Sequence, residues 1–453
     1  MASSITPFLV EEARRLSLRP LPPEVLDAAR HCVLDWLAVS LAGAEQPLVA
    51  PLMQMAEEQG GKPISSVLRH GFKTSPAFAA LINGSMSDAL DFADSNQNMR
   101  GHSTPGVVAA ALAMTESRNG SGADLLASII AGVETETRIG VAMKRTLKPG
   151  WHPTGSIAPF GCAAAAARSR GLNDEQWIHA LAIVATQAAG LHNSGGTMSK
   201  PFHSGKAAMN GILSASLAEH GFRGNPQAIE ASEGFLSTRG EAVDPEGLLA
   251  SSGKYLILET TFKSHAACAL THDTIDNLLY LMKEKGVTPA QVEKVEVQVP
   301  TLYLRVCNID EPKTGLQAKF SLRAVAAMTL LGDDTTDINA YTDERMAVPE
   351  VRDMRRRMEV QPKDDLNYVS NTNVILKDGR TLTARNDVRP SSKNSAQEPG
   401  PVRRKFGMLV TPLLGREATQ ELEHRVLTLE KLESVKTLIE LSLKAKQAAA
   451  KVA

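Results

Sequence analysis

The stretch Asp88-Ala-Leu-Asp-Phe-Ala-Asp-Ser-Asn-Gln-Asn-Met-Arg-Gly-His-Ser-Thr-Pro105 concentrates charge between two apolar segments of the chain. Asp88, Asp91 and Asp94 recur every three residues, so on a helix their carboxylates would lie close together. The segments on either side are apolar enough to form helices of the core. We therefore expect the chain to carry this acidic cluster into the interior or to the wall of a cleft.

Arg100 and His102 follow the three aspartates after a polar, turn-like break. Buried carboxylates need partners or have a raised pKa, and either case suits acid-base chemistry. The alternative is structural: the aspartates would cap the next helix and pair with Arg100. The residues alone leave both interpretations open.

The composition indicates a globular protein with a large core. The chain has 453 residues, of which 43% are hydrophobic and 22% charged, and this size favours two domains. A net charge of -1 provides no basic face, which argues against nucleic-acid binding. The N-terminal segment reaches acidic residues too soon for a signal peptide, and no apolar run is as long as a membrane span. We expect a cytoplasmic protein without membrane contact.

The four cysteines are far apart and form no paired motif. A disulfide framework and a structural zinc site are therefore not expected, and small buried thiols are. Aromatic residues make up only 4% of the chain, which favours closely packed helices over a sandwich or barrel.

Helical periodicity dominates the first half of the chain. It predicts helices over residues 10–42, 77–91, 107–117, 122–141, 157–169, 177–189 and 207–220. A glycine-rich, basic loop over 190–206 would precede the last of these, and free N-H groups at a helix start favour anions. The loop is not a P-loop, because Lys200 stands where that motif requires glycine. An ordinary solvated connection is the alternative.

The pattern changes near residue 290. Residues 293–299 alternate with period two and predict a strand, and 373–383 predict a hairpin that turns at Asp378-Gly379. Helices are expected over 267–285 and 320–331, and a final helix carries an apolar stripe from Leu422 to Ile439. We therefore expect a mainly α fold: a helical domain from residues 1–262 and 404–453, with an α+β lid domain of residues 263–403 inserted.

Three further polar clusters stand at breaks between helices, over 150–155, 200–203 and 262–273. Each mixes His or Lys with Gly, Pro or Thr, and together they indicate a shared polar site. No compact metal-ligand motif appears, so a metal site would need distant residues, and we expect neither metal nor cofactor. Several cations with aspartates suit a small polyanionic substrate that undergoes proton transfer next to a carboxylate.

At this point the chain resembles the MmgE/PrpD family, which includes 2-methylcitrate dehydratase, cis-aconitate decarboxylase and iminodisuccinate epimerase. The motifs that carry the resemblance are Ala89-Leu-Asp-Phe-Ala-Asp94 with Gly101-His102, Gly150-Trp-His-Pro-Thr-Gly155, Gly161 with its alanine run, Lys200-Pro-Phe-His-Ser-Gly205, Ala318-Lys-Phe-Ser-Leu322 and Arg404-Lys-Phe-Gly-Met408. The resemblance implies a helical domain from both chain ends with an inserted α+β lid, a homodimer, and catalysis on small polycarboxylates without metal or organic cofactor.

Carried over residue by residue, the resemblance places the active site at Asp94, His102, His152, Lys200 and Lys263. By chemistry we assign proton transfer to His102, its orientation to Asp94, and the role of second acid or base to His152. The two lysines would hold substrate carboxylates. Further substrate contacts are expected from Arg100, His203, Lys206 and His265.

Two departures from the family pattern bear on the reaction. Ala93 replaces the first residue of a common Asp-Asp pair, and Ala324 replaces a tyrosine, which is a departure from cis-aconitate decarboxylase. The runs that end in His102 and Lys200 look more like the epimerase branch.

Our leading hypothesis is a cofactor-independent lyase of a small hydroxy-di- or tricarboxylate, like 2-methylcitrate dehydratase. The alternatives are an epimerase or isomerase of a small dicarboxylate such as iminodisuccinate, a cis-aconitate decarboxylase, and a non-catalytic carboxylate-binding protein.

Overall fold

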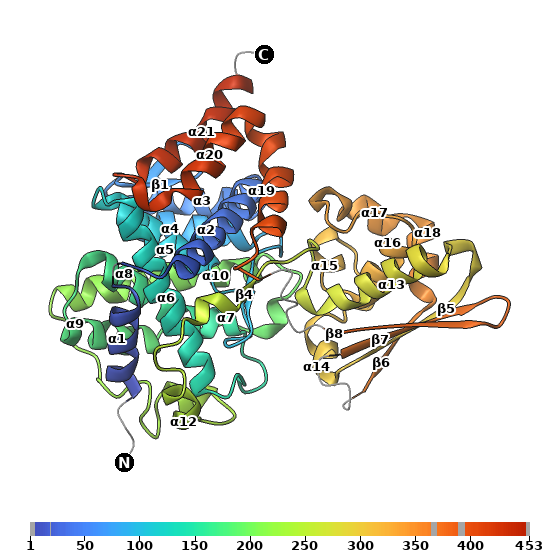
Figure 1. Cartoon of the computed structure of the whole chain (residues 1–453), viewed down its shortest axis with the longest axis horizontal. Helices are drawn as coiled ribbons and strands as arrows, with labels where there is room; N and C mark the ends of the chain where they lie inside the picture. The colour runs from blue at the N-terminus through green and yellow to red at the C-terminus, as the bar shows by residue number, and fades with distance from the viewer. Residues whose placement is uncertain (1–4, 19, 364–368, 388–394, 450–453) are drawn as a thin grey trace.

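The computed structural model describes residues 5–18, 20–363, 369–387 and 395–449, with the backbone alone for 387 and 444–449. A larger helical part and a smaller part with a four-stranded sheet lie side by side (Figure 1). The prediction of a mainly α fold is confirmed. None of the described helices is both long and apolar enough to cross a bilayer.

Helices from both ends of the chain build the larger part. Figure 1 shows the C-terminal helices, in red, packed beside the second helix of the chain. The helices are α1 (Ile5–Leu16), α2 (Pro23–Gly43), α3 (Val49–Gln59), α4 (Pro76–Asp88), α5 (Pro105–Ser117), α6 (Gly122–Ala142), α7 (Pro153–Ser156), α8 (Ala158–Arg170), α9 (Asp174–Ala185), α10 (Ser199–Glu219), α11 (Phe235–Arg239), α12 (Pro245–Leu249), α19 (Pro399–Leu414), α20 (Arg416–Leu427) and α21 (Lys436–Ala449). A short hairpin of β1 (Ser65–Val67) and β2 (Phe72–Thr74) precedes α4.

Glycines allow α4 and α10 to cross at very short range in the centre of this part. A Cβ atom on Gly205 would lie 2.0 Å from the carbonyl oxygen of Leu81, and one on Gly84 would lie 2.9 Å from the Cα of Gly205. No side chain fits between the two backbones. The crossing therefore fixes the first turn of α10, with Lys200, beside the C-terminal end of α4, with Asp88.

The smaller part has its own core under a sheet of order β6-β5-β7-β8. Its strands are β5 (Val292–Val299), β6 (Met358–Pro362), β7 (Val369–Leu376) and β8 (Thr381–Asp387), with β5 and β6 parallel and the other pairs antiparallel. Its helices are α13 (His272–Lys285), α14 (Thr301–Val306), α15 (Gly315–Ala318), α16 (Leu322–Leu330), α17 (Asp343–Ala347) and α18 (Pro349–Arg356). Buried side chains alternate along β5 as predicted, and the predicted hairpin turns at Gly379, whose φ is 88°.

The two chain crossings between the parts run next to each other. β4 (Thr260–Thr261) pairs with β3 (Ser95–Asn96), and the amide of Ala396 donates to the carbonyl of Thr260 at 2.7 Å. This pairing brings the chain entering the smaller part beside the turn that follows α4. The buried residues of the second core run from 268 to 384. The domain limits given above stay a prediction, and the limit at 404 falls inside α19.

Several predicted helices have different bounds in the structure. α4 ends at Asp88, so the three aspartates do not share a helix, and the predicted helix over 10–42 is split into α1 and α2. α10 starts at Ser199, eight residues before its predicted start, because Pro201 is compatible with a first helical turn.

The expected final helix is two helices, α20 and α21, with the segment between them bonded to another part of the chain. The carbonyl of Leu432 accepts from the amide of Gly122, and the amide of Val435 donates to the carbonyl of Gly120. These main-chain bonds to the turn before α6 replace helical ones. The four cysteines are buried and free, as predicted.

The close crossing leads to a stability prediction. Gly205→Ala should lower the free energy of unfolding by about 1–3 kcal/mol, because the added methyl overlaps the backbone of α4. Gly407→Ala in α19 is the matched control, since a Cβ there meets nothing within 4 Å and should stabilise the helix by about 0.5–1 kcal/mol. Urea unfolding measures both. Equal stability of the two variants would contradict the crossing.

Candidate active site

Two aspartates from the end of α4 converge on one lysine ammonium. Asp88 closes the helix, and Asp91 follows in a turn where its φ is 50°. Lys200 Nζ, from the first turn of α10, donates to Asp88 Oδ1 at 2.7 Å and to Asp91 Oδ1 at 2.5 Å. All three side chains are at least 93% buried. The predicted burial of the acidic cluster is confirmed, since Asp94 is buried as well, and two of the three aspartates share one cation.

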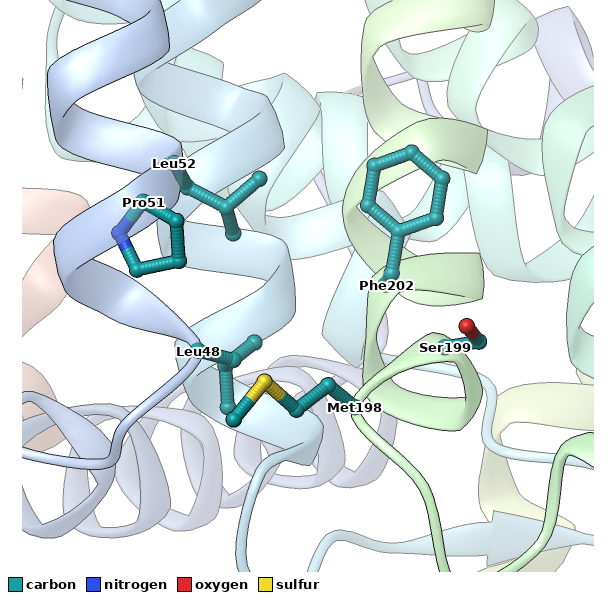
Figure 2. Close-up of a pocket in the computed structure, with 6 residues that line it drawn as sticks. All are labelled: Leu48, Pro51, Leu52, Met198, Ser199 and Phe202. Carbon is teal, nitrogen blue, oxygen red and sulfur yellow. The ribbon is translucent and has the colours of Figure 1, made fainter.

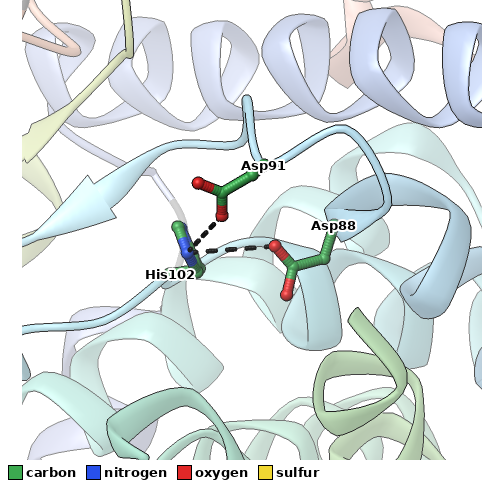
Figure 3. A group of neighbouring side chains, drawn as sticks. All are labelled: Asp88, Asp91 and His102. Atoms are coloured by element: carbon green, nitrogen blue, oxygen red, sulfur yellow. Dashed lines mark ion pairs between the residues drawn. The ribbon is translucent and has the colours of Figure 1, made fainter. Parts of the chain in front are cut away.

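His102 completes this group. Its Nε2 lies 3.1 Å from Lys200 Nζ and 3.8 Å from one carboxylate oxygen of each aspartate (Figure 3). The donor atoms of Asp88, Asp91 and His102 all lie within 4.8 Å of one another, a spacing that could hold a metal ion. The Lys200 ammonium, however, already lies within bonding distance of all three. The cation that fits between these donors belongs to the chain itself.

The His102 ring is fixed in one tautomer by its second nitrogen. Nδ1 lies 2.7 Å from the main-chain carbonyl oxygen of Asp94, to which it can only donate. Nε2 of the neutral ring is then an acceptor and takes a hydrogen bond from Lys200. Burial, followed by the positive charge of Lys200, lowers the pKa of His102 to about 4. The imidazole is therefore neutral near pH 7.

Asp94 orients His102 through its backbone and not through its carboxylate. The carboxylate accepts from the hydroxyl of Ser103 and, at 2.7 Å, from the hydroxyl of Thr104. Burial raises the pKa of Asp94 to about 6, although both hydroxyls oppose the shift. The sequence predicted the orienting residue, but its carboxylate serves to close the turn that carries His102.

Three more lysines bond to consecutive carbonyl groups of the turn after α4. Lys319 Nζ donates to Leu90 O at 2.6 Å, Lys263 Nζ to Asp91 O at 2.7 Å, and Lys405 Nζ to Phe92 O. Lys263 also lies 3.2 Å from Asp91 Oδ2, and Lys405 donates to the carboxylate of Asp35 at 2.7 Å. These buried cations hold the turn in place from three different segments of the chain.

Burial and neighbouring charges shift the pKa values of Asp91 and Lys319. Burial alone would raise the pKa of Asp91, but Lys200 and Lys263 outweigh it and hold that pKa well below its usual range. Burial lowers the pKa of Lys319 to about 7. Lys319 and Lys405 were missed as site residues. The only signal was their place in the motifs 318–322 and 404–408, where single lysines stand among apolar residues.

His152 and His203 form a pair beside this centre. Their Nδ1 atoms lie 3.1 Å apart, and the ring of His192 lies 5.8 Å from that of His152. Burial and Lys200 lower the pKa of His152 well below its usual range, and burial lowers that of His203 to about 4. The structure therefore brings two predicted residues together and adds His192, which was not predicted.

The other expected substrate contacts lie elsewhere. The Arg100 side chain is exposed. Lys206 Nζ donates to Ala189 O at 2.7 Å, and His265 lies 2.7 Å from Thr335 Oγ1 and 3.1 Å from Asp276 Oδ1. No described contact joins these side chains to Lys200, and their substrate roles stay predictions.

Lys200 and Lys263 were expected to hold substrate carboxylates. The three N-H groups of the Lys200 ammonium already have partners in Asp88, Asp91 and His102. To bind a substrate carboxylate, Lys200 would have to give up its hydrogen bond to one of these three residues. That role also stays a prediction.

An apolar cavity of about 220 Å³ lies between the start of α3 and the first turn of α10 (Figure 2). It is lined by Leu48, Pro51, Leu52, Met198, Ser199 and Phe202. Lys200 and His203, in the same turns, contact the acid-base centre instead. Because no charged side chain lines the cavity, it does not suit a carboxylate.

Comparison with protein families gives a match over most of the chain. The MmgE/PrpD N-terminal domain matches residues 9–246, and the MmgE/PrpD C-terminal domain matches residues 265–431. The chain belongs to the MmgE/PrpD family. Among curated relatives, cis-aconitate decarboxylase from Mus musculus is 26% identical over 97% of this chain and 94% of its own length. Cis-aconitate decarboxylase from Aspergillus terreus is 28% identical over 97% and 96%.

The low pKa of His102 predicts how stability depends on pH. In the unfolded chain the His102 ring takes up a proton below about pH 6.5, whereas in the folded protein it does so only near pH 4. The free energy of unfolding therefore decreases as the pH falls from about 6.5 to about 4. At pH 5 this contribution is about 2 kcal/mol. The stability loss between pH 7 and pH 5 should therefore be smaller by about that amount in His102→Gln.

Urea unfolding at the two pH values measures this difference directly. His424→Gln, on the exposed surface of α20, serves as the control and should follow the wild type. If His102→Gln lost as much stability on acidification as the wild type, the neutral, buried state of His102 would be refuted.

Proposed function

We propose that this protein is a lyase that acts on a small tricarboxylate by proton transfer at His102. The observation that carries the proposal is the hydrogen bond between the Lys200 ammonium and the unprotonated Nε2 of neutral His102, in a buried group where the same ammonium also pairs with two carboxylates. Such a preorganised donor-acceptor pair suits general acid-base catalysis. The relatives named cis-aconitate decarboxylase support the substrate class.

Decarboxylation of cis-aconitate is the first reaction to test. One carbon-carbon bond breaks and carbon dioxide leaves, while the electron pair stays on the carbon skeleton, which takes up one proton to give an unsaturated dicarboxylate. A bound polyanion next to His102 raises the pKa of the ring, so that the imidazole gains a proton on binding. Protonated His102 is then the donor to the carbanion, and Lys200 stabilises the negative charge beside it.

Dehydration of a hydroxytricarboxylate such as 2-methylcitrate is the second candidate. An elimination starts with removal of a proton, for which a neutral imidazole with a free Nε2 is suited. Ala324, where the family often has a tyrosine, is fully buried in α16 and provides no hydroxyl group. That departure favours a reaction other than decarboxylation. The relatives described above give no support to the epimerase alternative.

Proton NMR of the EDTA-treated protein with cis-aconitate, 2-methylcitrate and citrate separates the reactions. A lyase yields new vinyl signals, from the dicarboxylate after decarboxylation or from the alkene after dehydration. His102→Gln should lower turnover by about 10²-fold or more, whereas His424→Gln should leave it unchanged. Undiminished turnover in His102→Gln would refute the role of His102, and binding without turnover in the wild type would favour a carboxylate-binding protein.

The family resemblance also supports proposals about the location of the protein, its oligomeric state and its need for a cofactor. We propose a cytoplasmic homodimer that acts without a cofactor. Light scattering on the purified protein measures its mass, and the same turnover assay before and after EDTA treatment tests the need for a metal.

A further inference from the structure

Three imidazoles gather at the outer side of the acid-base centre. The His152 ring lies 5.1 Å from that of His203 and 5.8 Å from that of His192, measured between ring centroids. His203 is 93% buried, whereas His152 and His192 are half-buried. The group thus extends from the buried Lys200 towards the surface. We call these three residues the histidine cluster.

The backbone holds the histidine cluster in a defined geometry. The amide of His192 donates to the carbonyl of Gly150, and the amide of His152 donates to the carbonyl of Gly190, both at 2.9 Å. Two segments from distant parts of the sequence are thereby paired, with one histidine on each. A Cβ atom on Gly190 would lie 3.2 Å from the His203 ring, so this glycine lets the helix bearing His203 approach closely.

The rings have unused hydrogen-bonding capacity. The short contact between the Nδ1 atoms of His152 and His203 requires one protonated and one unprotonated nitrogen, so a single proton is shared there. Among the residues that the structure describes, no hydrogen bond reaches the ring nitrogens of His192 or the Nε2 atoms of His152 and His203. A neutral imidazole group of this kind can take up protons and donate to an anion.

Charged side chains and a further imidazole lie close to the histidine cluster. Lys200 and His102 face His152, and Lys206 and Asp88 face His203. Asp88 is the one carboxylate in this set, and it already accepts from Lys200 and, at 2.8 Å, from the hydroxyl of Ser204. Burial, reinforced by Lys200 at two of the rings, lowers the pKa of all three histidines. Neutral imidazoles at this position are free to donate to an anion.

We propose that His152, His192 and His203 form the subsite for one carboxylate of the tricarboxylate substrate, and that His192 makes the protein distinguish tricarboxylates from dicarboxylates. This inference rests on the proposed function. In this structure all three N-H groups of Lys200 have partners, whereas the imidazoles of the histidine cluster have unused nitrogens. His203 follows Lys200 by about one turn of α10, His152 contacts His203, and the His192 ring lies beyond it, 5.8 Å from the His152 ring. His192 therefore stands at the outer end of the histidine cluster, where we expect the additional carboxylate.

Calorimetry with non-reacting ligands tests the subsite without any turnover. The probes are propane-1,2,3-tricarboxylate and glutarate, and the variants are His192→Asn and the surface control His424→Asn. His192→Asn should weaken binding of the tricarboxylate about tenfold, the loss expected for one hydrogen bond to a charged group, and leave glutarate binding unchanged. The control should bind both ligands like the wild type.

Three results would overturn the proposal: unchanged tricarboxylate binding in His192→Asn, equal weakening of both ligands, or no tricarboxylate binding by the wild type. Far-ultraviolet circular dichroism with thermal melting verifies that His192→Asn, a substitution at a half-buried turn residue, is folded. The predicted binding pattern together with no turnover of any tricarboxylate would refute the proposed lyase reaction and leave the subsite standing. Failure of the subsite proposal and failure of the proposed lyase reaction therefore give different results.

Discussion

The bonds from one buried ammonium group to two carboxylates and an imidazole determine the geometry of the candidate active site. Lys200 reaches Asp88, Asp91 and His102 at 2.5 to 3.1 Å, in a region from which water is almost excluded. An unpaired charge at such depth would be costly, and removal of either partner would leave one. The close crossing of α4 and α10 places Lys200, in the first turn of α10, beside Asp88 at the end of α4.

The turn after α4 links this interaction to the rest of the fold. Lysines from the smaller part, from the chain crossing and from α19 each bond to one of its carbonyl groups. Since Lys319 comes from the smaller part and Lys263 from the chain that leads into it, the position of the smaller part and the shape of the acid-base centre depend on each other. The histidine cluster lies beside this centre and reaches from buried His203 to half-buried His152 and His192.

The sequence was informative where patterns are local. Alternation over β5 and the Asp378-Gly379 turn predicted strands correctly, and the density of charge near Asp91 predicted a buried polar site. The three-residue spacing of the aspartates was misleading, because the helix ends at Asp88 and the backbone turns at Asp91. Lys319 bonds to a carbonyl 229 residues away, a pairing that no local pattern encodes.

The most direct test of this account is nitrogen-15 NMR of the protein labelled at histidine, with the His102 signals assigned from His102→Gln. The account predicts a protonated Nδ1 and an unprotonated Nε2 at pH 7, with the ring still neutral at pH 5, because Nδ1 donates to Asp94 O and Nε2 accepts from Lys200. A positively charged ring at pH 7, or a proton on Nε2 of the neutral ring, would contradict the bond from Lys200 on which the account depends.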